Sequence, residues 1–125
     1  MTVRARWIAL LAGFFLLMVG IGAVPGEANA LSGRFGDKLL HMLAYGFMAV
    51  LCFHALVATP LVRALFTVAA VAMLGIVDES IQWLLPYRNA SLRDWCFDIG
   101  SAAIVAAALL LLDRITTPME SHAKN

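Results

Sequence analysis

The stretch WIALLAGFFLLMVGIGAV, from Trp7 to Val24, decides the fold because it runs without a single charged residue. A transmembrane helix needs about 20 predominantly apolar residues, within a range of about 17–25. The chain of 125 residues is 62% hydrophobic and 14% charged, whereas soluble domains are about 45–50% apolar and about 25% charged. The sequence therefore predicts an integral membrane protein rather than a soluble domain.

Three further apolar segments follow this first span and are separated from one another by short connections. Short connections favour antiparallel neighbours in a helical bundle. We therefore expect an all-α integral membrane protein, a four-transmembrane-helix bundle with up-down-up-down order. It would form a single domain over residues 1–125, with a loop after the first span and a polar tail at 113–125. The expected helices are residues about 7–24, 39–59, 61–85 and 92–112.

The N-terminal segment also has a second interpretation, as a secretory signal peptide that is removed. Arg4 and Arg6 precede the apolar run, and Ala28-Asn29-Ala30 after it resembles an A-x-A cleavage site. Cleavage would leave a three-helix mature chain. The apolar core of a signal peptide usually has about 7–15 residues. The run from Trp7 to Val24 is longer, which favours a span that is retained.

Basic residues near the span ends predict the orientation of the bundle. Arg4 and Arg6 favour a cytoplasmic N-terminus, and four spans then return the C-terminus to the cytoplasmic side. The bias over the rest of the chain is small, so the prediction depends mainly on the first span. The basic residues expected outside are Arg34, Lys38, Arg88 and Arg93.

Polar residues of the later spans fall on stripes that share one end of the bundle. In the second span, Asp37, His41 and Tyr45 have the i, i+4, i+8 spacing of one helical face. Alternating topology places the polar ends of the three later spans at the same membrane face, so we expect one polar cavity there. The stripes are Asp37, Lys38, His41 and Tyr45; then Asp78, Glu79 and Gln82; then Ser91, Asp94, Asp98 and Ser101.

Acidic residues inside apolar spans are expected to have a purpose. A charge near the bilayer centre costs about 2.5–3.5 kcal/mol on insertion scales, so these carboxylates should face protein or water. The candidates for acid/base catalysis are Asp78, Glu79, Asp94 and His41. The candidates for ligand binding are Asp37, Lys38, Tyr45, Gln82, Arg88, Ser91, Arg93 and Asp98.

Several of these residues also have a structural interpretation. Ser91 and Asp94 match the S/T-x-x-D/E capping box of a helix start. Asp37 suits the first turn of a helix, where a carboxylate complements the helix dipole. Arg88 and Arg93 are also plausible as interfacial anchors.

Capping does not explain the three polar residues in the last third of the third span. For Asp78, Glu79 and Gln82, a functional site and a hydrogen-bond network that locks the bundle both stay open. A metal site built from these acids with Asp98 and His41 is sterically conceivable, but the spacing matches no known metal motif. The sequence therefore predicts neither a metal nor another cofactor.

Three polar runs of the chain resemble one known family. They are DKLLHMLAY at 37–45, DESIQ at 78–82 and RNASLRD at 88–94. These runs are similar to the VanZ-like family, whose pattern is DK-x-x-H-x-x-x-Y, then DE-x-x-Q, then R-x-x-S-x-x-D-x-x-x-N with small residues following. Two positions depart from it: Asp98 stands where the family has Asn, and Ser101 where it usually has Gly.

The resemblance covers residues 37 to about 105 and implies a small multi-pass protein of the bacterial inner membrane. The family's namesake is linked to resistance to the glycopeptide teicoplanin, and the family name supplies no reaction. The implied partner is a membrane lipid or a lipid-linked cell-envelope precursor at the outer face. The net charge of +1 gives no support for nucleic-acid binding.

Three functional hypotheses follow from these observations. The first is an enzyme or binding site for an anionic head group of a lipid-linked envelope precursor. The second is a non-catalytic membrane factor that binds or excludes a lipid-anchored antibiotic. The third is a component of a proton-coupled transporter, which would need a homo-oligomer or another partner because four short helices are few.

Overall fold

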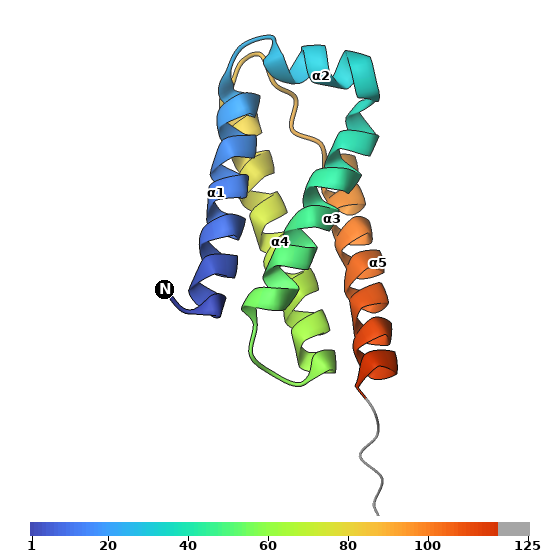
Figure 1. The fold of residues 1–125 in the computed structure, drawn as a ribbon. Coiled ribbons are helices and arrows are strands. Elements are labelled where there is room, and N and C mark those ends of the chain that lie inside the picture. The colour runs from blue at the N-terminus through green and yellow to red at the C-terminus, as the bar shows by residue number, and fades with distance from the viewer. Residues whose placement is uncertain (118–125) are drawn as a thin grey trace, which may run out of the picture.

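The computed structural model describes residues 1–117, and within them the chain forms helices and no strand. Figure 1 shows the long helices side by side and the short helix α2 lying across one end, called the α2 end below. The start of the first helix and the end of the last lie together at the opposite end. The helices are α1 (Val3–Ala23), α2 (Glu27–Phe35), α3 (Asp37–Ala55), α4 (Pro60–Leu84) and α5 (Leu92–Thr116).

Four of these helices, α1, α3, α4 and α5, are long and apolar enough to cross a membrane. This confirms the predicted all-helical fold with four such segments. In the most apolar 18-residue stretch of α3, half of the residues are buried inside the protein. In the corresponding stretch of α1, no residue is buried. The helix α3 is therefore central, and α1 covers it from the side.

The helix bounds differ from the expected spans at several ends. The helix α1 starts at Val3 because the Oγ1 atom of Thr2 accepts the N–H of Ala5 at 3.2 Å and caps it. The helix α5 continues to Thr116, so helix replaces the first part of the expected tail. Apolar runs predict the membrane-crossing part of a helix, and polar flanks extend the helix beyond it. The rest of the expected tail, residues 118–125, lies outside the described residues.

The short helix α2 corrects the prediction of a loop after the first span. Gly26 with φ 88° and Gly36 with φ 83° flank it, and glycine adopts this left-handed backbone at little cost. A helix of this length is marginal in isolation, so its neighbours must stabilise it. The hydroxyl of Ser32 donates to Oδ1 of Asp37 at 3.1 Å, which ties α2 to the start of α3.

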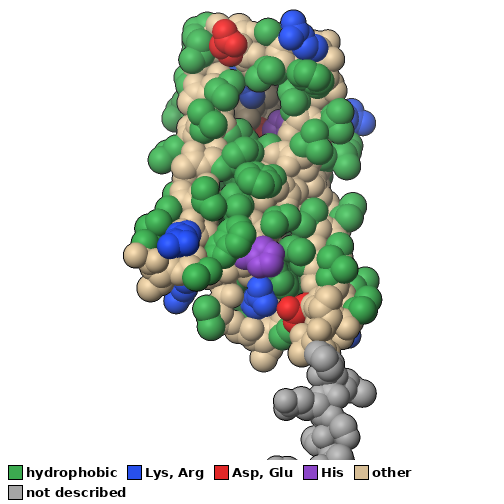
Figure 2. Space-filling view, in the orientation of Figure 1, with side chains coloured by type: hydrophobic (Ala, Val, Ile, Leu, Met, Phe, Trp, Pro, Cys, Tyr) green, Lys and Arg blue, Asp and Glu red, His purple; other side chains and the backbone are tan. Residues whose placement is uncertain are grey.

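The core lies between α3, α4 and α5, where small residues allow a close approach of the helices. A Cβ atom on Gly46 would lie 3.0 Å from Oγ of Ser101, and one on Gly75 would lie 2.8 Å from Cδ1 of Trp95. Hydrophobic side chains are spread along the face of the bundle that Figure 2 shows, and charged side chains gather toward its two ends. The fully buried core residues are Tyr45, Met48, Ala49, Val71 and Ala102.

Candidate functional site

A cavity of about 210 Å³ lies at the α2 end, between α1, α2, α3 and α4. Figure 2 shows a hollow near this end in which basic, acidic and histidine side chains are visible. The α1 and α2 sides of the cavity are mostly apolar, and the α3 and α4 sides are mostly polar. The apolar lining includes Phe14, Leu17, Met18, Ile21 and Leu31, and the polar lining comprises Ser32, Asp37, His41, Tyr45, Asp78, Gln82 and Arg88.

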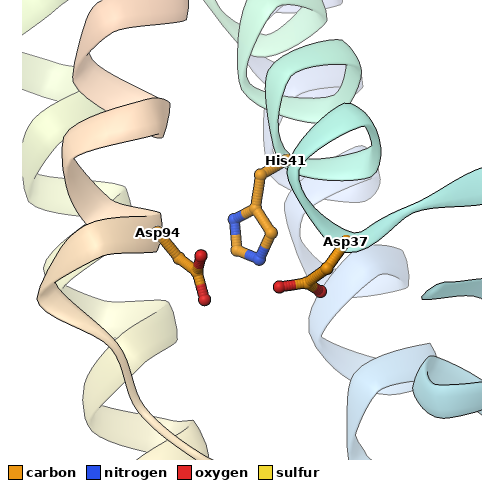
Figure 3. Close-up of side chains that lie close together, drawn as sticks. All are labelled: Asp37, His41 and Asp94. Carbon is orange, nitrogen blue, oxygen red and sulfur yellow. The ribbon is translucent and has the colours of Figure 1, made fainter.

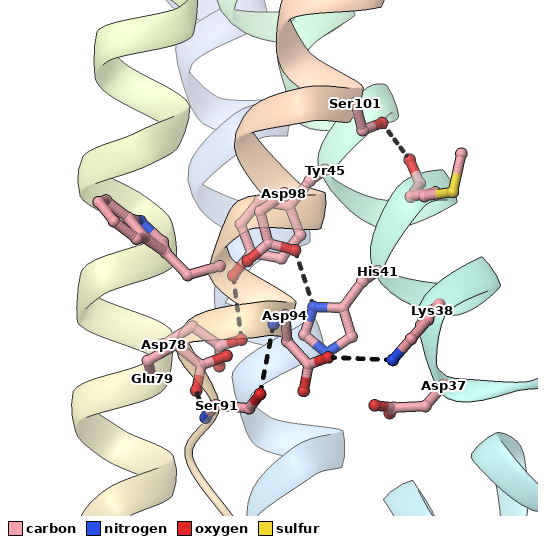
Figure 4. A network of polar contacts seen from close by, with 12 residues as sticks. Asp37, Lys38, His41, Tyr45, Asp78, Glu79, Ser91, Asp94, Asp98 and Ser101 are labelled. Carbon is pink, nitrogen blue, oxygen red and sulfur yellow. Dashed lines mark hydrogen bonds and ion pairs between the residues drawn. The ribbon is translucent and has the colours of Figure 1, made fainter.

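Asp78 joins α3 to α4 through a buried carboxylate. Its Oδ2 accepts the hydroxyl of Tyr45 at 3.0 Å and the side-chain amide of Gln82 at 3.0 Å. Tyr45 is fully buried, and Asp78 and Gln82 are 7% and 6% exposed. This arrangement, drawn in part in Figure 4, supports the bundle-locking interpretation for this acid.

Glu79 caps the start of α5 from the neighbouring helix. Its Oε2 accepts the backbone N–H of Ser91 at 2.7 Å, while Oγ of Ser91 accepts the N–H of Asp94 at 3.4 Å. The predicted capping bond to the Ser91 hydroxyl is therefore present. The predicted return bond from Asp94 is wrong, because the carboxylate that accepts the Ser91 N–H belongs to Glu79. The chain between α4 and α5 brings Ser91 back beside Glu79, which leaves the carboxylate of Asp94 free for other contacts.

His41 joins α3 to α5. Its Nδ1 lies 2.8 Å from Oδ1 of Asp98, whose side chain is fully buried. The His41 ring stacks on Tyr45 with centroids 5.9 Å apart and planes at 2°. One turn further along, Oγ of Ser101 donates to the carbonyl of Met42 at 2.6 Å. The predicted meeting of the stripes on α3 and α5 is therefore present.

The charges of the site are incompletely paired. Within residues 1–117, the one ion pair between a lysine or arginine and an acid of the α2 end joins Lys38 to Asp94 at 4.0 Å. The other close contact of an acid there is the one between Asp98 and His41. In the same part of the chain, Oε1 of Glu79, Oδ2 of Asp98 and Nε of Arg88 are buried without a hydrogen-bond partner. Only Arg88 among these three residues lines the cavity.

The structure brings most of the predicted residues together and leaves one outside. Arg93 is exposed and does not line the cavity. Five other predicted residues belong to the polar network but not to the cavity lining: Lys38, Glu79, Ser91, Asp94 and Asp98. Sequence reasoning missed the apolar wall from α1 and α2, because a uniformly apolar span does not indicate which of its faces a cavity uses. The two glycines that flank α2 were the available signal for that helix.

Comparison of the chain with protein-family models, curated proteins and solved structures finds no match. The chain is a helical protein with four helices able to cross a membrane and a cavity of mixed polarity at one end.

Proposed function

We propose that this chain is a VanZ-like protein of the bacterial inner membrane that binds the anionic head group of a lipid-linked cell-envelope precursor at the outer face. The order and spacing of the three polar runs support the family assignment. The polarity of the cavity supports an amphiphilic ligand, since an acyl or prenyl chain fits the α1 and α2 wall and a polar head fits the α3 and α4 wall.

The single observation that carries the proposal is the position of Arg88. It follows α4, lines the cavity, and its buried Nε has no hydrogen-bond partner within the described residues. A guanidinium is the side chain best suited to pair with phosphate or carboxylate through two parallel hydrogen bonds. An anionic head group in the cavity would satisfy this atom.

The proposed location at the outer face depends on the orientation of α1. Arg4 and Arg6 lie in the first turns of α1, at the end of the bundle opposite to α2, and the positive-inside rule favours the cytoplasm for that end. The α2 end and its cavity then open at the outer leaflet. The same arrangement would give a lipid-anchored glycopeptide access to the cavity, which is consistent with the antibiotic-related alternative.

Binding is better supported than acid/base catalysis by Asp78. Both of its hydrogen-bond donors, Tyr45 and Gln82, come from the protein itself and are buried. A carboxylate used in this way holds two helices together and is poorly placed to exchange protons with a substrate.

The proposal is tested by head-group selectivity. The purified protein in detergent is titrated with a polyprenyl phosphate and with the corresponding uncharged polyprenol, and binding is measured by native mass spectrometry. We expect the phosphate to bind more tightly, and Arg88→Gln to weaken its binding about 10- to 100-fold, because a hydrogen bond to a charged group contributes about 1.5–3 kcal/mol.

Arg93→Gln is the matched control, since Arg93 carries the same charge at the same end of the bundle but is exposed and outside the cavity lining. It should bind the phosphate like the unchanged protein. Equal binding of phosphate and alcohol, or equal losses in the two arginine variants, would contradict the proposal.

A further inference from the structure

His41 lies between two aspartates that begin two different helices. Asp37 is the first residue of α3, and Asp94 lies in the first turn of α5. Figure 3 shows the His41 ring pointing into the space between the two carboxylates. One nitrogen of His41 and one oxygen of each aspartate all lie within 4.8 Å of one another.

The contact with Asp98 determines which nitrogen of His41 is free. The contact of 2.8 Å engages Nδ1 of His41 with Oδ1 of Asp98. The other nitrogen, Nε2, can ligate a metal ion once it carries no proton. It has no hydrogen-bond partner within residues 1–117, and Figure 3 shows it on the side of Asp37 and Asp94. The His41 side chain as a whole is only 10% exposed.

The two aspartates are held in place but only weakly neutralised. Asp37 accepts the hydroxyl of Ser32 at 3.1 Å, and the backbone N–H of Asp94 is capped by Ser91. Lys38 lies at the limiting distance of 4.0 Å from Oδ1 of Asp94, and nearly half of its side chain is exposed. Two carboxylates and an imidazole nitrogen therefore face one another, and within the described residues Lys38 is the one lysine or arginine within 4.0 Å of them.

We propose that Asp37, His41 and Asp94 bind a divalent transition-metal ion of the Zn²⁺ and Mn²⁺ type. An imidazole nitrogen and carboxylate oxygens are the ligands that such ions take in proteins. Asp98 acts as a positioning residue, because a histidine that ligates a metal usually donates its other N–H to a carboxylate. The order Asp98, His41, metal reproduces that arrangement.

Three protein ligands leave coordination positions open, and two of the three line the cavity. Asp37 and His41 both face the space assigned above to the head group. Arg88 lines the same cavity, so an ion held there and the guanidinium would both face the space of the proposed phosphate. The metal site goes beyond the proposed lipid binding, and its own test needs no lipid.

A second set of ligands, His41 with Glu79 and Asp98, shares the same histidine. The set with Asp37 and Asp94 is favoured because Asp98 already accepts from Nδ1 and Glu79 already accepts the N–H of Ser91. It also opens to the cavity, which gives the ion a path of entry.

The experiment uses the purified full chain in detergent, stripped with a chelator and titrated with Zn²⁺, Mn²⁺ and Mg²⁺ separately. We expect about one equivalent of bound Zn²⁺ or Mn²⁺ by elemental analysis, with a metal-dependent rise in melting temperature. Co²⁺ in the same site should give a visible absorption spectrum. We expect Asp37→Asn, His41→Gln and Asp94→Asn each to abolish stoichiometric binding, and Asp98→Asn to weaken it about 10- to 100-fold.

Asp113→Asn is the control, since Asp113 pairs with Arg63 at 3.7 Å at the other end of the bundle. It should bind metal like the unchanged chain. Absence of stoichiometric metal, or an equal loss in the control, would overturn the proposal. So would unchanged binding in Asp37→Asn and Asp94→Asn together with a loss in Glu79→Gln, because that pattern would assign the ion to the other ligand set. Because only metal is added, failure here leaves the lipid-binding test unaffected.

Discussion

Replacing Asp78 by Ala is expected to destabilise the folded bundle by about 1–3 kcal/mol for each buried donor left without a partner. Two donors are affected, the hydroxyl of Tyr45 and the amide of Gln82, and both lie 3.0 Å from the same carboxylate oxygen. Tyr45 has no exposed surface, so its hydroxyl gains little hydration in the variant. Thermal unfolding of the purified protein in detergent, with membrane abundance as a second readout, measures the effect.

Asp78→Asn is the matched variant because it keeps a side-chain oxygen at the same place. It should retain the hydrogen bond from Tyr45 or from Gln82 and lose less than half as much stability. If Asp78→Ala unfolds like the unchanged protein while ligand binding is lost, Asp78 belongs to the functional site and its structural role is refuted.

The second large effect is expected at the crossing of α4 and α5. Gly75→Val would place Cβ 2.8 Å from Cδ1 of Trp95 and 3.3 Å from Oδ2 of Asp98. The Trp95 ring cannot move away freely, because its Nε1 donates to the carbonyl of Ala72 at 2.9 Å. Overpacking of this kind usually costs about 1–3 kcal/mol, and the displacement would also disturb Asp98 beside His41.

Gly100→Val is the control for this prediction. Gly100 also lies inside a helix long and apolar enough to cross a membrane, but a Cβ there meets no atom within 4 Å. Both substitutions carry the same helix-propensity change, so the difference between their melting temperatures reports the packing alone. Equal melting temperatures would show that α4 and α5 do not approach each other at Gly75 as described.

Much of this site follows from helical periodicity alone. Residues spaced by four share a face of a helix, so His41 and Tyr45 were expected to point the same way as Asp37. The spacing on the fourth span likewise placed Asp98 on the face that meets His41. The cost of a charge in an apolar span identified Asp78 and Glu79 without any knowledge of the fold.

Other features depend on contacts that no single helix encodes. The Glu79 contact with the Ser91 N–H replaces the predicted bond from Asp94 and joins residues of two helices across a turn. The helix α2 is too short to stand out from a loop by its hydrophobic pattern. The place of Arg88 in the cavity lining depends on the path of the same turn, whereas Arg93 is exposed because it lies in α5 on another face than Asp94 and Asp98.

The central claim is that an anionic amphiphile occupies the cavity at the α2 end, and photo-crosslinking tests it most directly. The purified protein is irradiated with a long-chain alkyl phosphate that carries a photoreactive group on its chain, and labelled residues are mapped by mass spectrometry. The account predicts labelling at Met18 and Leu31, which line the cavity, and suppression of this labelling by excess unlabelled phosphate. Labelling spread over exposed positions of α5 such as Ile104 and Leu111, without competition, would contradict it.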